Sequence, residues 1–466
     1  MTWCQGYRYS EHSSPFAGEP QRVYDVYYLT SAGPNNQGRQ CIYWHGGGWR
    51  ATRANYQATG AAQEFMVRLA QNYCGAVYTP AYTLTARMGL QSPIDSTATS
   101  MALQFDSLAG LMPYFPTGGK YKVVVDQENS LAETMTVTSQ SGSGNDVKLN
   151  VIRGSKAVAH SGGWRGFLFM GNSGPGVYKV TTAGSGGVPG TYALGFSGSS
   201  CTGALPAGTY TVGSDGSVSV WTVKSLGVGC SSLSVSFPNG PANASATAQY
   251  MGAGVTVPET QWPVPGNDVA AFHSFLAHCA AGGSSRGVGS CASYSSDSIP
   301  GNPLDQVVFG DSAGAHLAAM VALTGSSLLN TSAGTPGYSE WADTGWKVRA
   351  YAIWSVPSDL FTMFQTSTNF GNVQMTLLAL LGRPPVINDK ASPVTYISPS
   401  NPPGLVINGT LDPVTPNGQA SELYATGAAV GVAVTGQGHE LDVWKFPGVT
   451  LGAVYSFLEA EGARGW

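Results

Sequence analysis

Charge is scarce in this chain of 466 residues. Only 10% of the residues are charged, with 22 Lys and Arg against 26 Asp and Glu, which gives a formal net charge of -4. A nucleic-acid-binding surface needs clustered basic residues, and this composition supplies no such field. Low charge with abundant Ser, Thr, Asn and Gly is typical of exported proteins or virion components, so we expect an extracellular or exported protein.

Long hydrophobic runs are also missing. No run approaches the roughly 18 apolar residues of a membrane span, and residues 1–5 do not begin a visible signal peptide. The sequence contains no phosphate-binding glycine loop, metal-ligand cluster or dinucleotide fingerprint. We therefore expect no membrane span, no metal and no cofactor. Nothing in the sequence indicates an oligomeric state.

The 7 cysteines show no Cys-x-x-Cys spacing of the kind found in zinc and redox sites. In an oxidising compartment such cysteines form disulfides, and the odd count leaves at least one thiol free or pairing between chains. The candidate pairs are Cys201 with Cys230 and Cys279 with Cys291, and Cys41 with Cys74 has less support.

What the sequence does contain is a Gly-Asp-Ser-Ala-Gly segment at residues 310–314. The apolar residues 307–309 precede it and an alanine-rich stretch follows it, so it lies between a short buried strand and a helix. In that context it predicts a nucleophile elbow, a turn too tight for side chains at its two glycine positions. We therefore predict that Ser312 is a nucleophile. In a chain with 62 glycines the pattern alone is weak, and it needs support from other motifs.

A second motif, His-Gly-Gly-Gly-Trp, occupies residues 45–49 after the predicted strand at residues 41–44. Three glycines leave the backbone amides open to close approach. Hydrolysis of an ester or amide places negative charge on the carbonyl oxygen, and amides fixed around that oxygen stabilise the charge. An ordinary glycine turn is the alternative. The position at a strand end ahead of an elbow favours an oxyanion hole.

A serine hydroxyl needs a base, usually a histidine, and the histidine needs a carboxylate that orients it. One buried strand ends shortly before Asp412, and the next apolar strand ends shortly before His439. Parallel sheets place their sites beyond the carboxyl ends of their strands, so we predict a triad of Ser312, His439 and Asp412. Asp359, after another strand, is the rival carboxylate. His316, four residues after the serine, is expected to pack near the elbow without acting as the base.

These motifs resemble, in their order along the chain, the α/β-hydrolase superfamily, and within it the esterases related to hormone-sensitive lipase that carry a His-Gly-Gly-Gly loop. The resemblance covers roughly residues 20–90 and 258–466. Residues 76–84 depart from the family, because they lack the acid and the arginine that its members carry there.

The resemblance implies an α/β fold, namely an α/β-hydrolase with a mostly parallel central sheet, and a serine-dependent carboxylesterase that works through an acyl-enzyme. It also implies an oxyanion hole made by the amides of Gly47, Gly48 and Ala313, while a role for Gly46 stays open.

The substrate is less constrained. Trp44 and Trp49 flank the glycine loop, and Trp354 closes a predicted strand that should end near the site. They are candidates for an aromatic pocket, and core positions are an equal alternative. Short-acyl or aromatic esters are the first expectation for the substrate.

The middle of the chain differs in character. Residues 90–257 are rich in Gly, Ser, Thr and Val, with alternating runs that predict an inserted all-β sandwich or barrel, whereas residues 1–89 and 258–466 are assigned to the catalytic domain. The insertion is expected to be a lid or substrate-binding domain, with a solubilising or oligomer-forming decoration as the alternative. The predicted strands lie at residues 121–125, 135–138, 147–152, 167–169, 177–181, 194–197, 209–212, 218–223 and 233–237.

Two other functions are compatible with this organisation. The insertion could dock a polymer, which makes an esterase acting on polysaccharide O-acetyl or feruloyl groups, or on a polyester, the second hypothesis. A non-catalytic binding or surface protein on a hydrolase scaffold is the third. The complete set of triad candidates argues against this third hypothesis, because a decayed enzyme is expected to lose at least one of them.

Overall fold

The chain forms two compact units in the computed structural model. Unit 1 comprises Met1–Thr85, Glu259–Asp359 and Asn388–Trp466, and unit 2 comprises Ala86–Pro258 and Leu360–Ile387. The structure describes residues 2–8, 23–28, 39–49, 60–84, 88–105, 121–126, 131, 133–143, 146–164, 167–170, 176–197, 207–225, 234–250, 262–280, 302–327, 345–366, 372–381, 385–424, 429–439 and 447–463.

Unit 1 is built on an eight-stranded mixed sheet. Its strands, in spatial order, are β1 (Thr2–Arg8), β2 (Val23–Tyr28), β4 (Ala76–Pro80), β3 (Arg39–Trp44), β19 (Asn302–Asp311), β20 (Val348–Trp354), β21 (Gly404–Gly409) and β22 (Ala429–Val434). The strands from β4 to β22 pair in parallel, whereas β2 runs antiparallel to both β1 and β4. This largely parallel sheet agrees with the α/β-hydrolase architecture expected from the sequence.

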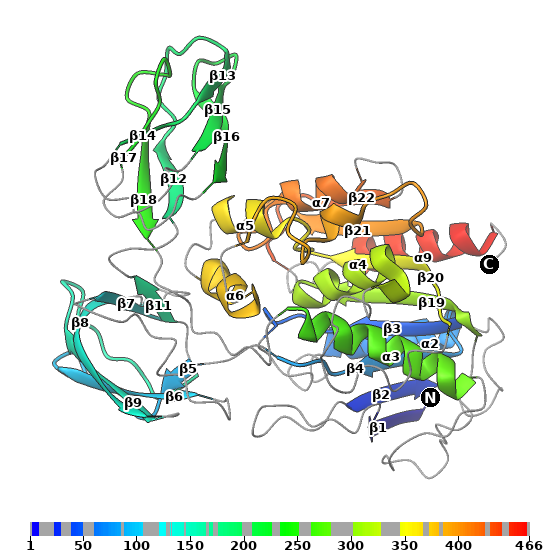
Figure 1. Cartoon of the computed structure of the whole chain (residues 1–466). Coiled ribbons are helices and arrows are strands. Elements are labelled where there is room, and N and C mark those ends of the chain that lie inside the picture. Colours follow the sequence, from blue (N-terminus) through cyan, green and yellow to red (C-terminus); the bar gives the residue numbers. More distant parts are fainter. Residues whose placement is uncertain are drawn as a thin grey trace. The chain divides into compact units, whose positions relative to one another are not determined.

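Helices cover both faces of this sheet (Figure 1). Side chains alternate between the two faces along a strand. Tyr43 of β3 accordingly joins a core that contains Phe65, while its neighbour Trp44 lies 5.8 Å from Phe272 on the opposite face, measured between ring centroids. The first face is covered by α2 (Gly60–Asn72) and α9 (Pro447–Ala463), and the second by α3 (Val264–Ala280) and α4 (Ala313–Thr324).

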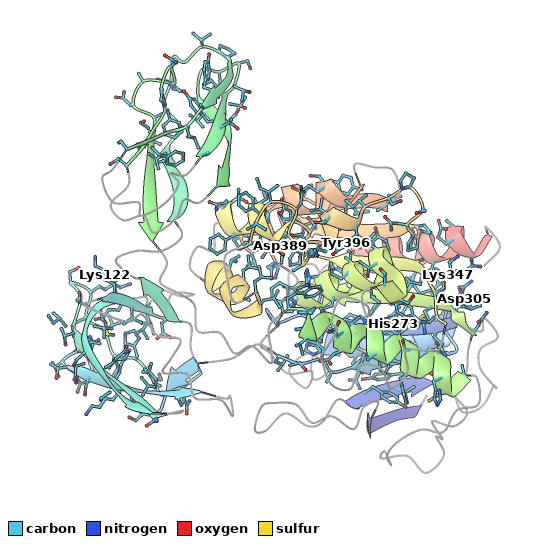
Figure 2. The ribbon with its side chains drawn as sticks, viewed as in Figure 1. Lys122, His273, Asp305, Lys347, Asp389 and Tyr396 are labelled. Carbon is cyan, nitrogen blue, oxygen red and sulfur yellow. A yellow bond between two sulfur atoms is a disulfide. The ribbon has the colours of Figure 1, made fainter. Side chains whose placement is uncertain are left out.

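Some polar groups within this core are paired across elements. The His273 ring on α3, labelled in Figure 2, lies with Nδ1 2.6 Å from Oε1 of Gln306 in β19. The Gln306 amide then donates to Gln40 of β3 at 3.0 Å. Burial lowers the pKa of His273 to about 4, so this ring is neutral at ordinary pH. His273 therefore fastens α3 to the sheet and offers no general base.

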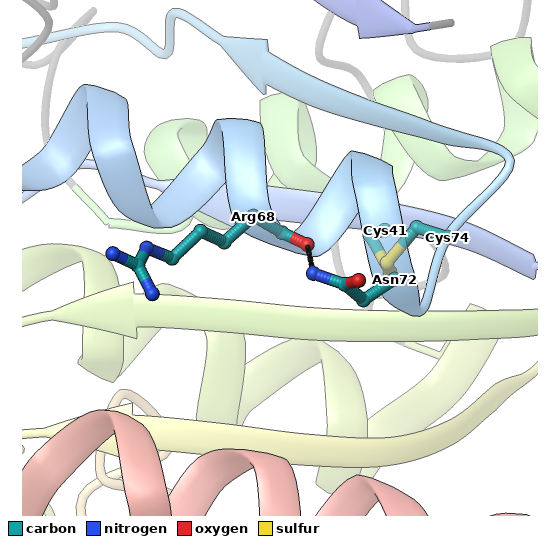
Figure 3. The surroundings of a disulfide bond; sticks show 4 residues. All are labelled: Cys41, Arg68, Asn72 and Cys74. Atoms are coloured by element: carbon teal, nitrogen blue, oxygen red, sulfur yellow. Dashed lines mark hydrogen bonds between the residues drawn. A yellow bond between two sulfur atoms is a disulfide. The ribbon is translucent and has the colours of Figure 1, made fainter.

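A disulfide joins β3 to the segment after α2 (Figure 3). The side-chain amide of Asn72 donates to the carbonyl of Arg68 at 2.9 Å and satisfies one of the acceptors at the helix end. Cys74 follows and bonds to Cys41, 33 positions away in sequence. The pairing with the least support from the sequence is thus present in the structure.

The other two predicted pairings involve residues outside the described part of the chain. Cys201, Cys230 and Cys291 are not described, and Cys279 is buried in α3. Both pairings stay predictions.

Unit 2 contains antiparallel sheets. The largest has seven strands in the order β10 (Gly163–Trp164), β5 (Met88–Leu90), β6 (Ser100–Phe105), β9 (Asp146–Ile152), β8 (Glu133–Ser143), β7 (Tyr121–Val125) and β11 (Phe167–Met170). Smaller sheets pair β12 (Gly176–Thr182) with β18 (Ser245–Tyr250), β13 (Gly190–Ala193) and β16 (Val218–Ser225) with β15 (Ala207–Val212), and β14 (Gly195–Ser197) with β17 (Ser234–Ser236). Each run predicted as a strand overlaps one of these strands.

Unit 2 also includes residues that the sequence had assigned to the catalytic domain. The segment Leu360–Ile387, which carries α5 (Leu360–Thr366) and α6 (Asn372–Leu381), groups with this unit. Unit 2 is therefore β-rich rather than purely β. Two short apolar helices do not differ in composition from those of an α/β domain, so the sequence offers no sign of this division.

A buried charged network lies within the seven-stranded part of unit 2. Nε and Nη2 of Arg153 donate to the two oxygens of Glu133 at 2.7 and 2.6 Å. The His160 ring lies between Glu133 and Asp126, with ring nitrogens 3.2 and 2.7 Å from their oxygens. Burial alone would raise the pKa of Glu133, but the hydrogen bonds from Arg153, the backbone and His160 outweigh it and lower that pKa to about 2. The network therefore holds this part of unit 2 together through an ionised carboxylate.

Candidate active site

The segment predicted as a nucleophile elbow is a strand–turn–helix junction. β19 ends at Asp311, α4 begins at Ala313, and Ser312 between them has φ 49° and ψ -117°, which is a strained conformation for a residue with a side chain. The Ser312 amide donates to the Trp354 carbonyl at 2.9 Å, which fixes the turn to β20. A Cβ atom at Gly310 would stand 2.4 Å from the Gly314 carbonyl oxygen, so the turn has no room for one.

The structure brings the three predicted triad residues together. His439 Nε2 lies 3.0 Å from Ser312 Oγ, and His439 Nδ1 lies 2.8 and 2.9 Å from the two oxygens of Asp412. A carboxylate only accepts hydrogen bonds, so the ring proton belongs on Nδ1, and Nε2 is left with a lone pair toward the serine hydroxyl. The Asp412 side chain is fully buried, whereas that of His439 is 21% exposed, so water has access at the histidine.

Asp412 is held by the turn that follows it. The Thr415 hydroxyl donates to Oδ2 at 2.6 Å, and the amides of Val414 and Thr415 donate to Oδ1 at 2.9 and 2.8 Å. Burial favours the neutral acid, yet the hydrogen bonds from His439 and Thr415 outweigh it and hold the pKa of Asp412 below its ordinary value. The sequence reasoning did not single out Thr415, although an aspartate followed three residues later by a threonine is a recognisable turn pattern.

The rival carboxylate has other neighbours. The Asp359 amide donates to Oε1 of Gln419 in α7 (Asn417–Tyr424) at 3.0 Å. Burial and the nearby Asp359 charge raise the pKa of Glu422, also in α7, to about 7. Asp359 thus forms a carboxyl pair with Glu422 of α7, whereas Asp412 lies against His439.

The glycine loop follows β3 beside the elbow. The Gly46 amide donates to Oδ1 of Asp311 at 3.1 Å, so this amide is already engaged. Gly47 and Gly48 have φ of 100° and 62°, values that side chains rarely adopt, and both are half-buried. This contact engages the Gly46 amide, and the next two glycines stay the loop's candidate donors. Ala313, the third candidate, begins α4, where amides lack partners within the helix.

Tyr82 holds the start of the loop. Its ring stacks on His45 with centroids 4.5 Å apart, and its hydroxyl donates to the His45 carbonyl at 3.0 Å. His45 Nδ1 in turn lies 2.9 Å from the Gly46 carbonyl oxygen. Tyr82 belongs to the segment that departs from the resembled family, and sequence reasoning gave it no role.

The three tryptophans proposed as substrate contacts are buried. Trp44 and Trp354 are 0% exposed and Trp49 is 2% exposed. Trp354 packs edge-on against Phe65, and Trp49 packs edge-on against His316. These contacts favour the alternative that the tryptophans are core residues.

His316 is a neutral structural histidine. Burial lowers its pKa to about 4, and Nε2 lies 2.7 Å from the carbonyl oxygen of Ala391, to which it donates its proton. It therefore packs beneath the elbow, and His439 remains the histidine at the serine. Among the described residues, no group of His, Cys, Asp or Glu is arranged to hold a metal ion. No helix within the described ranges is long and apolar enough to cross a membrane.

The family BD-FAE matches residues 301–426, a segment that contains both the elbow and Asp412. The chain is a carboxylic ester hydrolase, and the matched segment supports the α/β-hydrolase type. No curated protein matches this esterase.

Several solved esterases are similar in structure. A truncated carbohydrate esterase from gut microbiota is 21% identical, with 47% of this chain and 75% of that one covered and a TM-score of 0.33. Esterase B from Lactobacillus rhamnosis is 12% identical, with 99% and 85% covered and a TM-score of 0.44. A thermophilic esterase from the planctomycete Thermogutta terrifontis is 11% identical, with 97% and 94% covered and a TM-score of 0.43.

Proposed function

We propose that the esterase hydrolyses carboxylic esters through Ser312, His439 and Asp412, with an acyl-enzyme intermediate. The observation that carries this proposal is the continuous hydrogen-bonded chain from the Ser312 hydroxyl through the imidazole to the buried carboxylate. It supplies a nucleophile, a base with a free lone pair, and a group that fixes the tautomer and stabilises the charged ring. The His-Gly-Gly-Gly loop supports a place among the esterases related to hormone-sensitive lipase.

In each step of the proposed reaction, His439 accepts or donates a proton. His439 Nε2 takes the hydroxyl proton as Ser312 Oγ attacks the ester carbonyl, and the resulting oxyanion accepts hydrogen bonds from the amides of Gly47, Gly48 and Ala313. The imidazolium then gives its proton to the departing alcohol, which leaves an acyl group on the serine. A water molecule deprotonated by His439 attacks this acyl-enzyme, and the acid is released with the serine restored.

Replacement of the nucleophile tests this proposal. Ser312→Ala is expected to abolish hydrolysis of p-nitrophenyl acetate while the thermal unfolding midpoint changes little, and a fluorophosphonate should label the wild-type protein at Ser312 only. His439→Gln should slow both labelling and turnover. Full activity in Ser312→Ala, or labelling at another residue, would show that the nucleophile lies elsewhere.

Short-acyl or aromatic esters are the proposed substrates, and an ester borne on a polymer is the second candidate. The observation that favours the polymer is the size of unit 2, which interrupts the catalytic unit after Thr85 and again after Asp359. If unit 2 served only to support the catalytic fold, it would not need to be so large.

Deletion of residues 90–257, the larger part of unit 2, with a short linker separates the two candidates. If unit 2 docks a polymer, the shortened enzyme should keep its turnover of p-nitrophenyl acetate and lose activity on acetylated polysaccharide or polyester film. Equal losses on small and polymeric esters would instead indicate that unit 2 supports the catalytic fold.

We also propose that the enzyme is exported. The bonded pair Cys41 and Cys74 supports this, because disulfides persist in oxidising compartments. Peptide mapping without reductant should find this pair together with Cys201–Cys230 and Cys279–Cys291, and free thiols at all these positions would remove the argument.

A further inference from the structure

We propose that Asp311 is a positioning residue, which fixes the glycine loop of the oxyanion hole to the nucleophile elbow. The inference rests on the proposed function of Ser312 and extends it to a residue outside the triad. Asp311 is the last residue of β19 and is 0% exposed. Its place in the chain, directly before Ser312, makes any movement of its backbone a movement of the nucleophile.

The contacts of Asp311 reach across to the neighbouring strand. In the parallel pairing of β19 with β3, Phe309 lies opposite Tyr43 and Gly310 opposite Trp44. Asp311 therefore extends one residue beyond the end of β3, to the level where the glycine loop begins. There its Oδ1 accepts two hydrogen bonds, one from the Tyr43 hydroxyl and one from the Gly46 amide at 3.1 Å.

The Gly46 contact matters because the loop's two candidate oxyanion donors are next to it in the chain. Gly47 and Gly48 come directly after Gly46, and both have positive φ. A run of three glycines has more backbone freedom than any other sequence of that length. Its amides can therefore point together at one oxyanion only if other contacts hold the loop in place. Asp311 holds the first of the three in place, and the other two are the proposed donors to the oxyanion.

The geometry also indicates that the shape of the Asp311 side chain matters more than its charge. A negative charge beside an oxyanion hole opposes the charge that develops there, so the carboxylate offers no direct electrostatic help. Both donors use Oδ1, and Oδ2 has no donor among the residues that the structure describes. An asparagine in the same rotamer presents the same acceptor to both donors.

The contacts of Asp311 predict an order of effects among its variants. Asp311→Ala should lower kcat by about 10- to 100-fold, since displacement of an active-site group by about 1 Å costs up to about 100-fold. KM should change much less, because the oxyanion donors act mainly in the transition state. Asp311→Asn should recover most of the lost kcat. Tyr43→Phe should lower kcat less than Asp311→Ala, and the double variant should be no worse than Asp311→Ala.

Two readouts separate positioning from a purely structural role. A trifluoromethyl ketone forms a hemiketal with Ser312 whose alkoxide occupies the oxyanion hole, so Asp311→Ala should weaken its binding by the same factor as kcat. Hydrogen–deuterium exchange of the peptide covering residues 44–49 should accelerate in Asp311→Ala and stay slow in Asp311→Asn. The matched control is Ser274→Ala in α3, which removes a buried 2.8 Å hydrogen bond from Trp346 and should lower stability without changing kcat or the inhibitor affinity.

Three results would overturn the positioning role of Asp311. Wild-type kcat and inhibitor affinity in Asp311→Ala would overturn it, and so would an Asp311→Asn variant as impaired as the alanine variant, because the charge would then be the active feature. Loss of activity with unchanged exchange at residues 44–49 would also overturn it. Failure of the proposed function is distinguishable from all of these, because the wild-type enzyme would then neither react with the fluorophosphonate at Ser312 nor hydrolyse any ester.

Discussion

The second glycine of the elbow is the position where a single added carbon tests the active-site geometry most directly. A Cβ atom at Gly314 would stand 2.0 Å from the carbonyl oxygen of Trp44 and 2.6 Å from that of His45, both backbone atoms at the start of the glycine loop. Gly314 lies in α4, where alanine is an excellent helix former. Gly314→Ala therefore changes the contact with the loop without straining its own backbone.

These distances set the size of the expected effect on kcat. Cβ atoms essentially never approach another heavy atom more closely than 3.0 Å, so the loop must recede from α4 by about 1 Å or more. Displacement on that scale costs about 100-fold in rate, equivalent to about 2.7 kcal/mol of transition-state stabilisation. Overpacking of this kind also costs typically about 1–3 kcal/mol in the free energy of unfolding.

We expect Gly314→Ala to lower kcat for p-nitrophenyl acetate by about 100-fold or more. Circular dichroism and urea unfolding would show that the variant is folded, and fluorophosphonate labelling should slow in parallel with kcat because the phosphoryl oxygen uses the same donors. The matched control is Gly452→Ala in α9, an exposed helical glycine with nothing within 4 Å of its added Cβ. It should be slightly stabilised and fully active.

A folded Gly314→Ala enzyme with wild-type kcat would show that the glycine loop does not lie against the elbow. An equal loss of kcat in Gly452→Ala would show that the effect is a general consequence of adding methyl groups to helices.

Three further predictions concern stability. Arg153→Met leaves the buried Glu133 carboxylate without its cation, so unit 2 should lose about 3–5 kcal/mol in calorimetry while the kcat for small esters is kept. Because folding lowers the pKa of Glu133 to about 2 from 4.5, its contribution to stability should be complete above pH 4.5 and disappear as the pH falls toward 2. The Glu422 carboxyl should change stability with pH in the opposite direction, because burial and a neighbouring aspartate raise its folded pKa to about 7. Its destabilisation of the folded state should grow as the pH rises from 4.5 through 7. Glu422→Gln should therefore raise the unfolding midpoint at pH 8 and leave it unchanged at pH 4, and an equal gain at both would contradict this sign.

The parts of the site that could be predicted from the sequence are those that a local pattern encodes. A strand, a turn between two glycines and a helix occupy consecutive residues, so the place of Ser312 at a strand–helix junction is visible within one short segment. Asp412 follows a strand that reads as buried and His439 follows an apolar strand, and a parallel sheet brings such positions to one edge. In each case the required information lies within about ten residues of the chain.

The contacts that could not be predicted join residues distant in sequence. Tyr43 and Asp311 are 268 positions apart, and no local pattern links a tyrosine in one strand to an acid in another. Strand register creates the contact, and the register is fixed by the whole sheet. The tryptophans show the same limit. Trp354 does end a strand beside the site, but side-chain alternation directs it into the core against Phe65.

The two residues around the serine act on the glycine loop in opposite ways, and this sets the relative severity of their replacement. Gly314 permits the loop to approach, because no side chain stands between α4 and the carbonyl groups of the loop. Asp311 holds the loop in place, through the acceptor that binds Gly46. Loss of a tether leaves the correct geometry accessible for part of the time, because Tyr82 still holds the loop at His45. An inserted methyl group excludes that geometry altogether. Gly314→Ala should therefore impair turnover more than Asp311→Ala, and Asp311→Ala more than Tyr43→Phe.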